Sequence, residues 1–227
     1  MSSFDPDSVS LLTFDSYSTI VDVGSTVEAL EPHVDDPEYV AAEWRSHSLM
    51  YSMAANDVGA YEPFYELNRH ALTYALESAG ADVSEAERDE ILSVYMDLYV
   101  FDDVAEGVSR LSEGYDLWVV SNGNPEMLDR MFEVADLHDE VEGYISADEV
   151  ETFKPDPGIY THAADQLDTP VEEIAHVTAG WFDVAGAEGA GMQGVWVNRD
   201  DGPYPNFGPQ PSLEVDSFTA LADELGL

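Results

Sequence analysis

From residue 101 to the C-terminus, short apolar runs alternate with amphipathic segments, and this alternation limits the possible folds more than any other feature. Short apolar runs between turn residues are typical of buried strands, whereas apolar positions three and four residues apart are typical of helices. A regular alternation of the two predicts a parallel sheet with helices on both faces. The expected strands are 117–120, 144–146, 174–178 and 194–197, and the expected helices are 104–111, 125–135, 157–166, 184–189 and 218–225.

A further buried strand is expected at residues 9–14, where an apolar run ends at Asp15. After it the pattern changes, because residues 37–98 contain helical spacing and no convincing strand. Helices are expected over residues 38–54, 61–79 and 84–98. The sequence therefore predicts one α/β core whose first strand is followed by a long helical insert.

The charge of the chain limits the partners that it can have. There are 48 Asp and Glu residues against 7 Lys and Arg, which gives a formal net charge of −41. Disordered acidic chains lack aromatic residues, whereas aromatics make up 11% of this chain, so a folded protein is expected. Self-repulsion of this size is tolerated in concentrated salt, which predicts a halophile protein. The same field repels polyanions, so neither nucleic acid nor an anionic membrane is an expected partner.

Several structural classes are excluded by what the sequence lacks. It has no cysteine, and therefore no disulfide scaffold and no thiolate nucleophile. Its first ten residues are polar and acidic, unlike a signal peptide. No apolar run approaches the ~18 residues that a membrane-spanning helix needs. A soluble, cytoplasmic protein is the expectation.

Candidate site residues gather where the expected strands end. Ligands of a parallel sheet bind at the carboxyl ends of its strands, which meet at one edge. These ends provide carboxylates, hydroxyls and an amide, in Asp15 to Thr19, in Ser121 and Asn122, and in Thr178 to Asp183. For any one of these residues a solvated loop or a helix cap is the alternative, but together they favour a catalytic site.

Lys154 is the only lysine in the chain and lies just before an expected helix. Arginine is a planar fork, whereas lysine is a compact point charge, so a retained lysine indicates a role that arginine cannot fill. A lysine beside a carboxylate favours the ionised, nucleophilic form of that carboxylate. The alternative is chance retention in a surface loop.

Four segments resemble, in the same order, the four motifs of the haloacid dehalogenase superfamily. They read LLTFDSYSTIVDV from Leu11, VVSNGNP from Val119, FKPDP from Phe153 and WFDVAGA from Trp181. Within the superfamily the chain is most similar to the L-2-haloacid dehalogenases. This resemblance implies a Rossmann-like core of residues 1–23 and 100–227, a helical cap of residues 24–99 over the site and, commonly, a homodimer.

Two positions separate the dehalogenase branch from the phosphatases of the superfamily. Phosphatases have a second Asp two residues after the nucleophile as a general acid, where this chain has Tyr17, whose ordinary pKa of ~10 suits that role poorly. They also bind Mg²⁺ through a carboxylate four residues before the position of Asp183, where this chain has Ala179. The absence of both the acid and the metal ligand fits a halide leaving group, which needs no proton, and a substrate that carries no phosphate. No metal and no cofactor are therefore expected.

The resemblance also implies a role for each site residue. Asp15 attacks the halogen-bearing carbon of a short 2-haloalkanoic acid and forms an ester, Arg45 takes the departing halide, and water then releases a 2-hydroxy acid. The family precedent converts an (S)-substrate into an (R)-product. The residues implied in catalysis are Asp15, Thr19, Arg45, Ser121, Asn122, Lys154, Tyr160, Thr178 and Asp183, and those implied in substrate binding are Ser16, Tyr17, Leu49, Phe64 and Phe182.

Other interpretations remain open from the residues alone. Without the resemblance, Arg45 is a surface arginine on an amphipathic helix, and the apolar positions are ordinary core. The chain departs from its branch at Ser18, Thr178 and Gly180, where the branch has Gly, Ser and Asn. In the branch that asparagine helps to orient the site for ester hydrolysis. A superfamily phosphatase or other hydrolase, and a non-catalytic protein that binds small carboxylates, are therefore the alternative functions.

Overall fold

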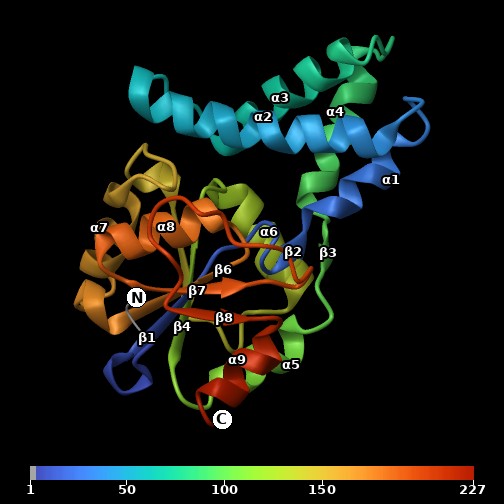
Figure 1. Ribbon diagram of the computed structural model, residues 1–227. Coiled ribbons are helices and arrows are strands. Elements are labelled where there is room, and N and C mark those ends of the chain that lie inside the picture. The colour runs from blue at the N-terminus through green and yellow to red at the C-terminus, as the bar shows by residue number, and fades with distance from the viewer. Residues whose placement is uncertain (1–3) are drawn as a thin grey trace.

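The computed structural model describes residues 4–227, which contain a six-stranded parallel sheet of order β5-β4-β1-β6-β7-β8 (Figure 1). This confirms the α/β fold predicted from the alternation and the Rossmann-like core that the resemblance implied. The strands are β1 (Leu11–Phe14), β4 (Asp116–Ser121), β5 (Gly143–Ser146), β6 (Ile174–Thr178), β7 (Gln193–Val197) and β8 (Leu213–Val215).

β1 lies at the centre of the sheet, where Leu12 pairs with Leu117 of β4 and with Ala175 of β6. All four residues of β1 are buried, as expected for a central parallel strand covered on both faces. The strand order reverses beside β1, since β4 and β5 extend to one side and β6 to β8 to the other. The crevice at such a reversal, outside the carboxyl ends of the strands, is where ligands bind in this class of fold.

Helices cover both faces of the sheet (Figure 1). On one face α7 (Pro157–Gln166) packs beside α8 (Trp181–Ala190), and on the other α5 (Val104–Leu111) packs beside α9 (Phe218–Glu224). α6 (Pro125–Ala135) connects β4 to β5. Gly186 permits close approach of α7 and α8, because a Cβ at this position would lie 2.5 Å from the hydroxyl of Tyr160. The α7–α8 contact therefore brings Tyr160 against the first turns of α8.

The segment after β1 forms a separate layer of helices above the carboxyl ends of the strands (Figure 1). It contains α1 (Thr26–Leu30), α2 (Pro37–Val58), α3 (Phe64–Ser78) and α4 (Glu85–Ser93). α2 begins after Asp36, whose side chain accepts from the amide of Tyr39, and ends at Gly59 with φ 65°, a left-handed value that glycine adopts without strain. The buried indole of Trp44 donates to the carbonyl of Asn68 at 2.9 Å and ties α2 to α3.

A two-stranded antiparallel pair, β2 (Val21–Asp22) with β3 (Tyr99–Val100), joins this layer to the sheet. The pair falls at the boundaries proposed above, and the division into a core of residues 1–23 and 100–227 and a cap of residues 24–99 stays a prediction. Among residues 4–227, none of the helices combines the length and apolarity needed to cross a bilayer.

The structure differs from the expectation where elements are short. The helix expected over 84–98 ends at Ser93, and a 3-10 turn, η3 (Val94–Met96), leads into β3. The strands β2, β3 and β8 have two or three residues each, too few for any periodicity to be recognised. The helix expected over 184–189 begins earlier, at Trp181, so that Asp183 lies in its first turn.

Candidate active site

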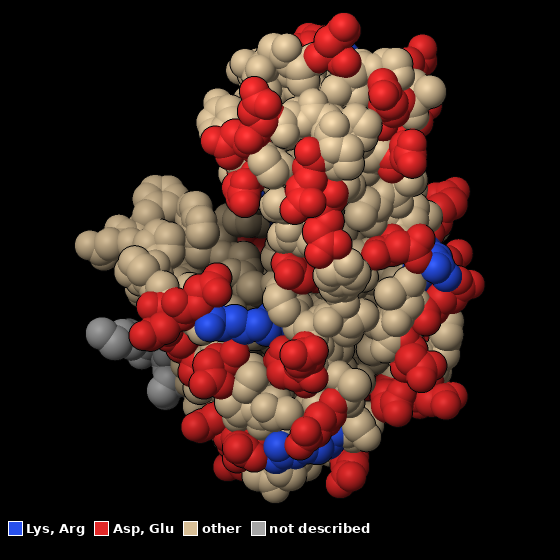
Figure 2. Space-filling view, turned by 90° about the vertical axis from the view of Figure 1, so that its right-hand side faces the viewer, with Lys and Arg blue, Asp and Glu red and all other residues tan. Residues whose placement is uncertain are grey.

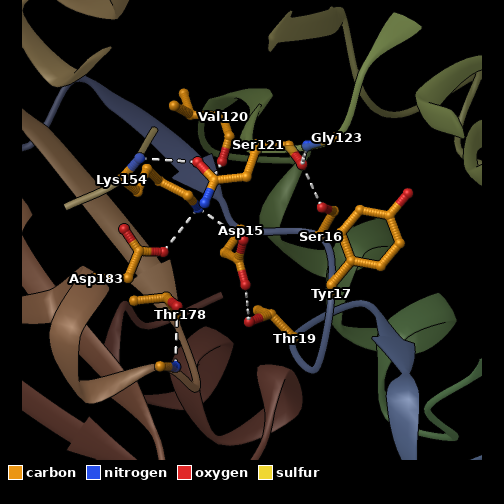
Figure 3. A network of polar contacts seen from close by, with 12 residues as sticks. Asp15, Ser16, Tyr17, Thr19, Val120, Ser121, Gly123, Lys154, Thr178 and Asp183 are labelled. Atoms are coloured by element: carbon orange, nitrogen blue, oxygen red, sulfur yellow. Dashed lines mark hydrogen bonds and ion pairs between the residues drawn. The ribbon is translucent and has the colours of Figure 1, made fainter. Parts of the chain in front are cut away.

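Asp15 follows the last residue of β1, in the crevice beside the strand reversal. Its amide donates to the carbonyl of Val177 in β6 at 2.9 Å, which continues the sheet ladder to the residue itself. Its two carboxylate oxygens have different partners (Figure 3). Oδ1 accepts from Nζ of Lys154 at 2.6 Å, and Oδ2 accepts from the hydroxyl of Thr19 at 2.9 Å. The carboxylate is therefore held in one orientation from both sides.

The ammonium of Lys154 has three partners and is only 2% exposed. Besides Asp15, it donates to Oδ2 of Asp183 at 2.7 Å and to the carbonyl of Val120 at 2.9 Å (Figure 3). Burial alone would lower the pKa of Lys154, but the charges and hydrogen bonds of Asp15 and Asp183 outweigh burial and raise that pKa above its usual value. Lys154 is thus a fixed, charged group between two carboxylates, and not a surface lysine.

Asp183 anchors the other end of this network and is fully buried. Its Oδ1 accepts from the hydroxyl of Tyr160 at 2.6 Å, and its Oδ2 lies 3.1 Å from Nε2 of His176. Burial would raise the pKa of Asp183, but Lys154 and His176 hold it well below its usual range. A carboxylate with this many donors is a weak base, so its arrangement suits positioning better than proton abstraction.

His176 was not found by sequence reasoning. It is buried in the middle of β6, and its Nδ1 lies 2.8 Å from the hydroxyl of Thr13 in β1. The tautomer with a proton on Nε2 satisfies both contacts, because it donates to Asp183 and accepts from Thr13. A single histidine in an otherwise apolar strand next to the strand of Asp15 was the signal available in the sequence.

The hydroxyl of Thr19 also accepts from the amide of Ala179 at 3.0 Å, which links the loops after β1 and β6. The backbone carbonyl of Thr19 accepts from Arg199, whose guanidinium forms an ion pair with Asp103 at 3.0 Å. Sequence reasoning missed Arg199. Thr178 lies at the same edge, one position beyond the Phe14–Val177 pair of the β1–β6 ladder, and its hydroxyl accepts from the amide of Gly180 at 3.1 Å.

The loop after β4 supplies Ser121 and Asn122. The hydroxyls of Ser121 and Ser16 lie 2.5 Å apart, and the amide of Gly123 donates to the hydroxyl of Ser121 at 2.9 Å (Figure 3). The side-chain oxygen of Asn122 accepts from the backbone amide of Lys154 at 2.8 Å. Asn122 therefore fixes the backbone of Lys154, and the Ser16–Ser121 pair joins the first two strand ends.

The helical layer contributes Arg45 from α2. One guanidinium nitrogen, Nη2, donates to the carbonyl of Tyr17 at 3.4 Å and to the hydroxyl of Ser18 at 3.3 Å. Ser18 adopts φ 72°, a left-handed value that favours glycine, so the contact with Arg45 occurs at a strained turn. Arg45 is therefore directed toward the loop of Asp15, and its role with the departing halide stays a prediction.

The apolar side chains predicted for the site come from both layers. The ring of Phe64, at the start of α3, lies 6.1 Å from that of Tyr17, and Leu49 is half-buried on α2 one turn after Arg45. Phe182 is also half-buried, and its ring occupies the space beside Gly180, where a Cβ would lie 3.2 Å away.

The side chains present do not fit a magnesium site. Both oxygens of Asp15 already have partners, and residue 179 is an alanine. Within the described range 4–227, no group of three or more His, Asp or Glu side chains is arranged to hold a metal ion.

Comparison with known proteins agrees with this geometry. The sequence model of the haloacid dehalogenase-like hydrolases matches residues 9–191. The chain belongs to this family. It is 33% identical to the (S)-2-haloacid dehalogenase 4A of Burkholderia cepacia over 95% of this chain and 94% of the relative. It is 32% identical to the (S)-2-haloacid dehalogenase 1 of Pseudomonas sp. strain CBS-3 over 90% and 91%.

Solved structures give the same placement. A dehalogenase solved with an intermediate complex superposes with a TM-score of 0.90 at 30% identity, covering 97% of this chain and 98% of the other. The L-2-haloacid dehalogenase of Xanthobacter autotrophicus with covalently bound chloropropionic acid gives a TM-score of 0.89 at 25% identity, covering 96% and 98%. Within the family, the chain lies in the branch of the L-2-haloacid dehalogenases.

Proposed function

We propose that the chain is a hydrolase of carbon–halogen bonds that converts short 2-haloalkanoic acids into 2-hydroxy acids and halide. The observation that carries this proposal is the carboxylate of Asp15, held by Lys154 on one oxygen and by Thr19 on the other at the strand reversal. The names of the relatives and the covalently bound chloropropionic acid in the Xanthobacter enzyme support the same reaction. The superfamily phosphatase and the non-catalytic carboxylate binder are not favoured.

In the first step an oxygen of Asp15 attacks the carbon that bears the halogen. A carbon–oxygen bond forms, and the halide leaves with the bonding electron pair. Fixing the carboxylate in one orientation lowers the entropic cost of this displacement. Apolar walls formed by Tyr17, Phe64, Leu49 and Phe182 would exclude water and strengthen the electrostatics within the site.

In the second step water attacks the carboxyl carbon of Asp15, and the bond from that carbon to the substrate oxygen breaks. One proton of the water ends on the hydroxy acid and the other is released, so the carboxylate is restored. Lys154, 2.6 Å from Oδ1 of Asp15, would stabilise negative charge on the carbonyl oxygen during this step. Asp183, Tyr160 and Asn122 would keep Lys154 in place.

The other site residues have supporting roles in the same two steps. Main-chain amides near Ser16 and Tyr17, together with Ser121 and Asn122, would hold the substrate carboxylate. Arg45, from the proposed cap, would stabilise the departing halide, since its guanidinium stays charged at all relevant pH. Thr178 would support the loop after β6 through the amide of Gly180. The homodimer implied by the resemblance stays a prediction.

We also propose that the chain works in the salt-rich cytoplasm of a halophile. The formal net charge of −41 supports this, as does the distribution of the acidic side chains. Figure 2 shows Asp and Glu scattered over one whole face, from the helical layer to the opposite end, with few Lys and Arg among them. At about 1 M salt the Debye length falls to ~3 Å, so repulsion between such side chains is screened.

The decisive test is halide release from the separate enantiomers of 2-chloro- and 2-bromopropionate in a concentrated halide-free salt. We expect release from the (S)-enantiomer with formation of the (R)-2-hydroxy acid. Absence of release from every substrate would overturn the proposal. Phosphate release from a phosphoester would then favour a phosphatase, and binding of 2-chloropropionate without turnover would favour a non-catalytic protein.

A further inference from the structure

Unsatisfied polar atoms gather beside Arg45. Among residues 4–227, the buried side-chain nitrogen and oxygen atoms without a hydrogen-bond partner are the hydroxyls of Tyr17 and Tyr95 and one Nη1 each of Arg45 and Arg199. Buried polar atoms without a partner are rare in native structures, and they mark places where a ligand, an ion or a water binds. Three of these four atoms belong to side chains of one cluster between the helical layer and the sheet.

The contacts within this cluster are close. The ring of Tyr95 lies 5.0 Å from that of Trp44, the residue before Arg45, and 5.9 Å from that of Tyr17. Tyr95 belongs to η3 at the base of the helical layer and is only 3% exposed. Figure 3 shows the hydroxyl of Tyr17 pointing away from Lys154 and Asp15, so this hydroxyl takes no part in the hydrogen bonds that hold the carboxylate.

The chemistry of the cluster suits an anion. Burial raises the pKa values of both Tyr17 and Tyr95 against the opposing charge of Arg45, which also lies within hydrogen-bonding reach of Tyr95, so both phenols keep their protons and can donate hydrogen bonds. The guanidinium of Arg45 has donors only. The Nη2 atom of Arg45 donates to the carbonyl of Tyr17 and to the hydroxyl of Ser18. Because the guanidinium is planar, these two contacts also fix the orientation of Nη1.

The surroundings favour a spherical, weakly hydrated anion over a carboxylate. Walls of aromatic rings, from Trp44, Tyr17 and Phe64, offer the positive ring edges that tolerate a polarisable ion. A carboxylate has two oxygens that each need donors, and hydroxyl and amide donors suited to it lie at the strand ends, near Ser16 and Ser121. The cluster therefore fits the halide and not the acid group of a 2-haloacid.

We propose that Tyr95 contacts the departing halide, with its hydroxyl and Nη1 of Arg45 as the two donors that receive the ion. This inference rests on the proposed function. Tyr95 is not part of any of the four sequence motifs, and it comes from the end of the helical insert, far along the chain from Arg45. The hydroxyl of Tyr17, on the neighbouring ring, is the further donor available to the ion.

The test compares Tyr95→Phe with the wild type in concentrated sodium sulfate, which supplies ionic strength without halide. Tyr95→Phe removes one hydrogen bond to a charged group, for which we expect about a tenfold loss of kcat with 2-chloropropionate. The loss should be smaller with 2-bromopropionate, since bromide depends less on hydrogen bonds than chloride does. Inhibition by added bromide, a measure of halide binding alone, should weaken in parallel.

Tyr115→Phe is the matched control, because Tyr115 precedes β4 at the edge of the sheet opposite to the site and is half-buried. It should leave kcat and bromide inhibition unchanged. Without halide, Tyr95→Phe should melt close to the wild type, since among residues 4–227 the buried hydroxyl that it removes has only the guanidinium of Arg45 within hydrogen-bonding reach.

Each other outcome overturns the inference. Unchanged kcat and bromide inhibition would leave Tyr95 as packing only. An equal loss for both halogens with a raised KM would assign the hydroxyl to the substrate carboxylate. A clearly lower melting temperature of Tyr95→Phe would assign its hydroxyl a structural role, as a partner of Arg45 or of a bound water. If the wild type itself releases no halide, the proposed function fails first, and this result is distinct from all of these.

Discussion

The Nζ atom of Lys154 lies 2.6 Å from Oδ1 of Asp15, and the same ammonium is bonded to Asp183 and to the carbonyl of Val120. All three of its donors are used in a buried space. Arginine is too large and too planar for a site built around a compact ammonium. Lys154→Arg, which keeps the positive charge and changes its shape, is therefore a stringent test of the site.

Lys154→Arg should lower turnover by about 10²-fold, since displacement of a catalytic group by about 1 Å costs that much. Its melting temperature in high salt should stay close to that of the wild type. Arg130→Lys is the control, because Arg130 is a half-buried residue on α6, outside the site, that pairs with Asp97 and Glu133. If Lys154→Arg were as active as this control, the assignment of the whole network would be wrong.

Asp15→Asn should abolish halide release, because the amide has no anionic oxygen to attack carbon. Lys154 keeps Asp183 as a partner, so the fold should remain, as circular dichroism can check. Retention of a tenth of wild-type turnover by the folded variant would exclude Asp15 as the nucleophile.

An isotope experiment on the wild type tests the same ester directly. In a single turnover in ¹⁸O-labelled water, the label should enter the carboxylate of Asp15, and the first 2-hydroxy acid released should be unlabelled. A labelled first product would mean that water attacks the substrate carbon without an ester intermediate.

Chelation should leave activity intact. Ala179 stands where a phosphatase has a magnesium ligand, and both oxygens of Asp15 are bonded to side chains of this protein. Halide release measured after dialysis against a chelator should equal that of an untreated sample. A strict requirement for added Mg²⁺ would contradict this and would return the phosphatase interpretation.

The strand ends of the site could be predicted because parallel strands bring their carboxyl ends to one edge. This argument alone places Asp15, Ser121 and Thr178 near one another, and Lys154 was recognisable as the only lysine. It does not give their contacts. Thr19 and Thr178 were both expected to hold the Asp15 ester; the hydroxyl of Thr19 donates to Asp15 and that of Thr178 accepts from the amide of Gly180, and the role of each in the ester stays a prediction.

The residues that were missed depend on approaches between distant segments. Tyr95 belongs to a 3-10 turn where a continuous helix was expected, and Arg199 acts through the carbonyl of Thr19 and the carboxylate of Asp103. Neither contact follows from spacing, because spacing describes one element at a time. His176 was also missed, but the sequence did contain a signal for it, because a polar residue buried in a central strand needs a hydrogen-bond partner.

Structure should be lost as salt is removed near neutral pH. Surface carboxylates repel one another over the whole face seen in Figure 2, and at ~0.01 M salt the Debye length of ~30 Å lets this repulsion act across the molecule. Circular dichroism and the melting temperature across a salt series measure the effect. A melting temperature that does not depend on salt would exclude the halophile proposal.

Activity should show a broad plateau with pH, and the two shifted pKa values set its limits. The pKa of Lys154 is raised, so the stabilisation from its charge is fully present below its ordinary pKa and is lost as pH rises through the higher value in the folded protein. The pKa of Asp183 is lowered, so its stabilisation is present above its ordinary pKa and is lost as pH falls through the lower value.

With ordinary values of ~10.4 for Lys and ~3.9 for Asp, both groups stay charged from about pH 5 to about pH 9.5. Halide release from 2-bromopropionate in high salt should therefore lack an alkaline limb below about pH 9.5, whereas a limb near pH 8 would mean that Lys154 titrates there and that the carboxylates do not hold its charge.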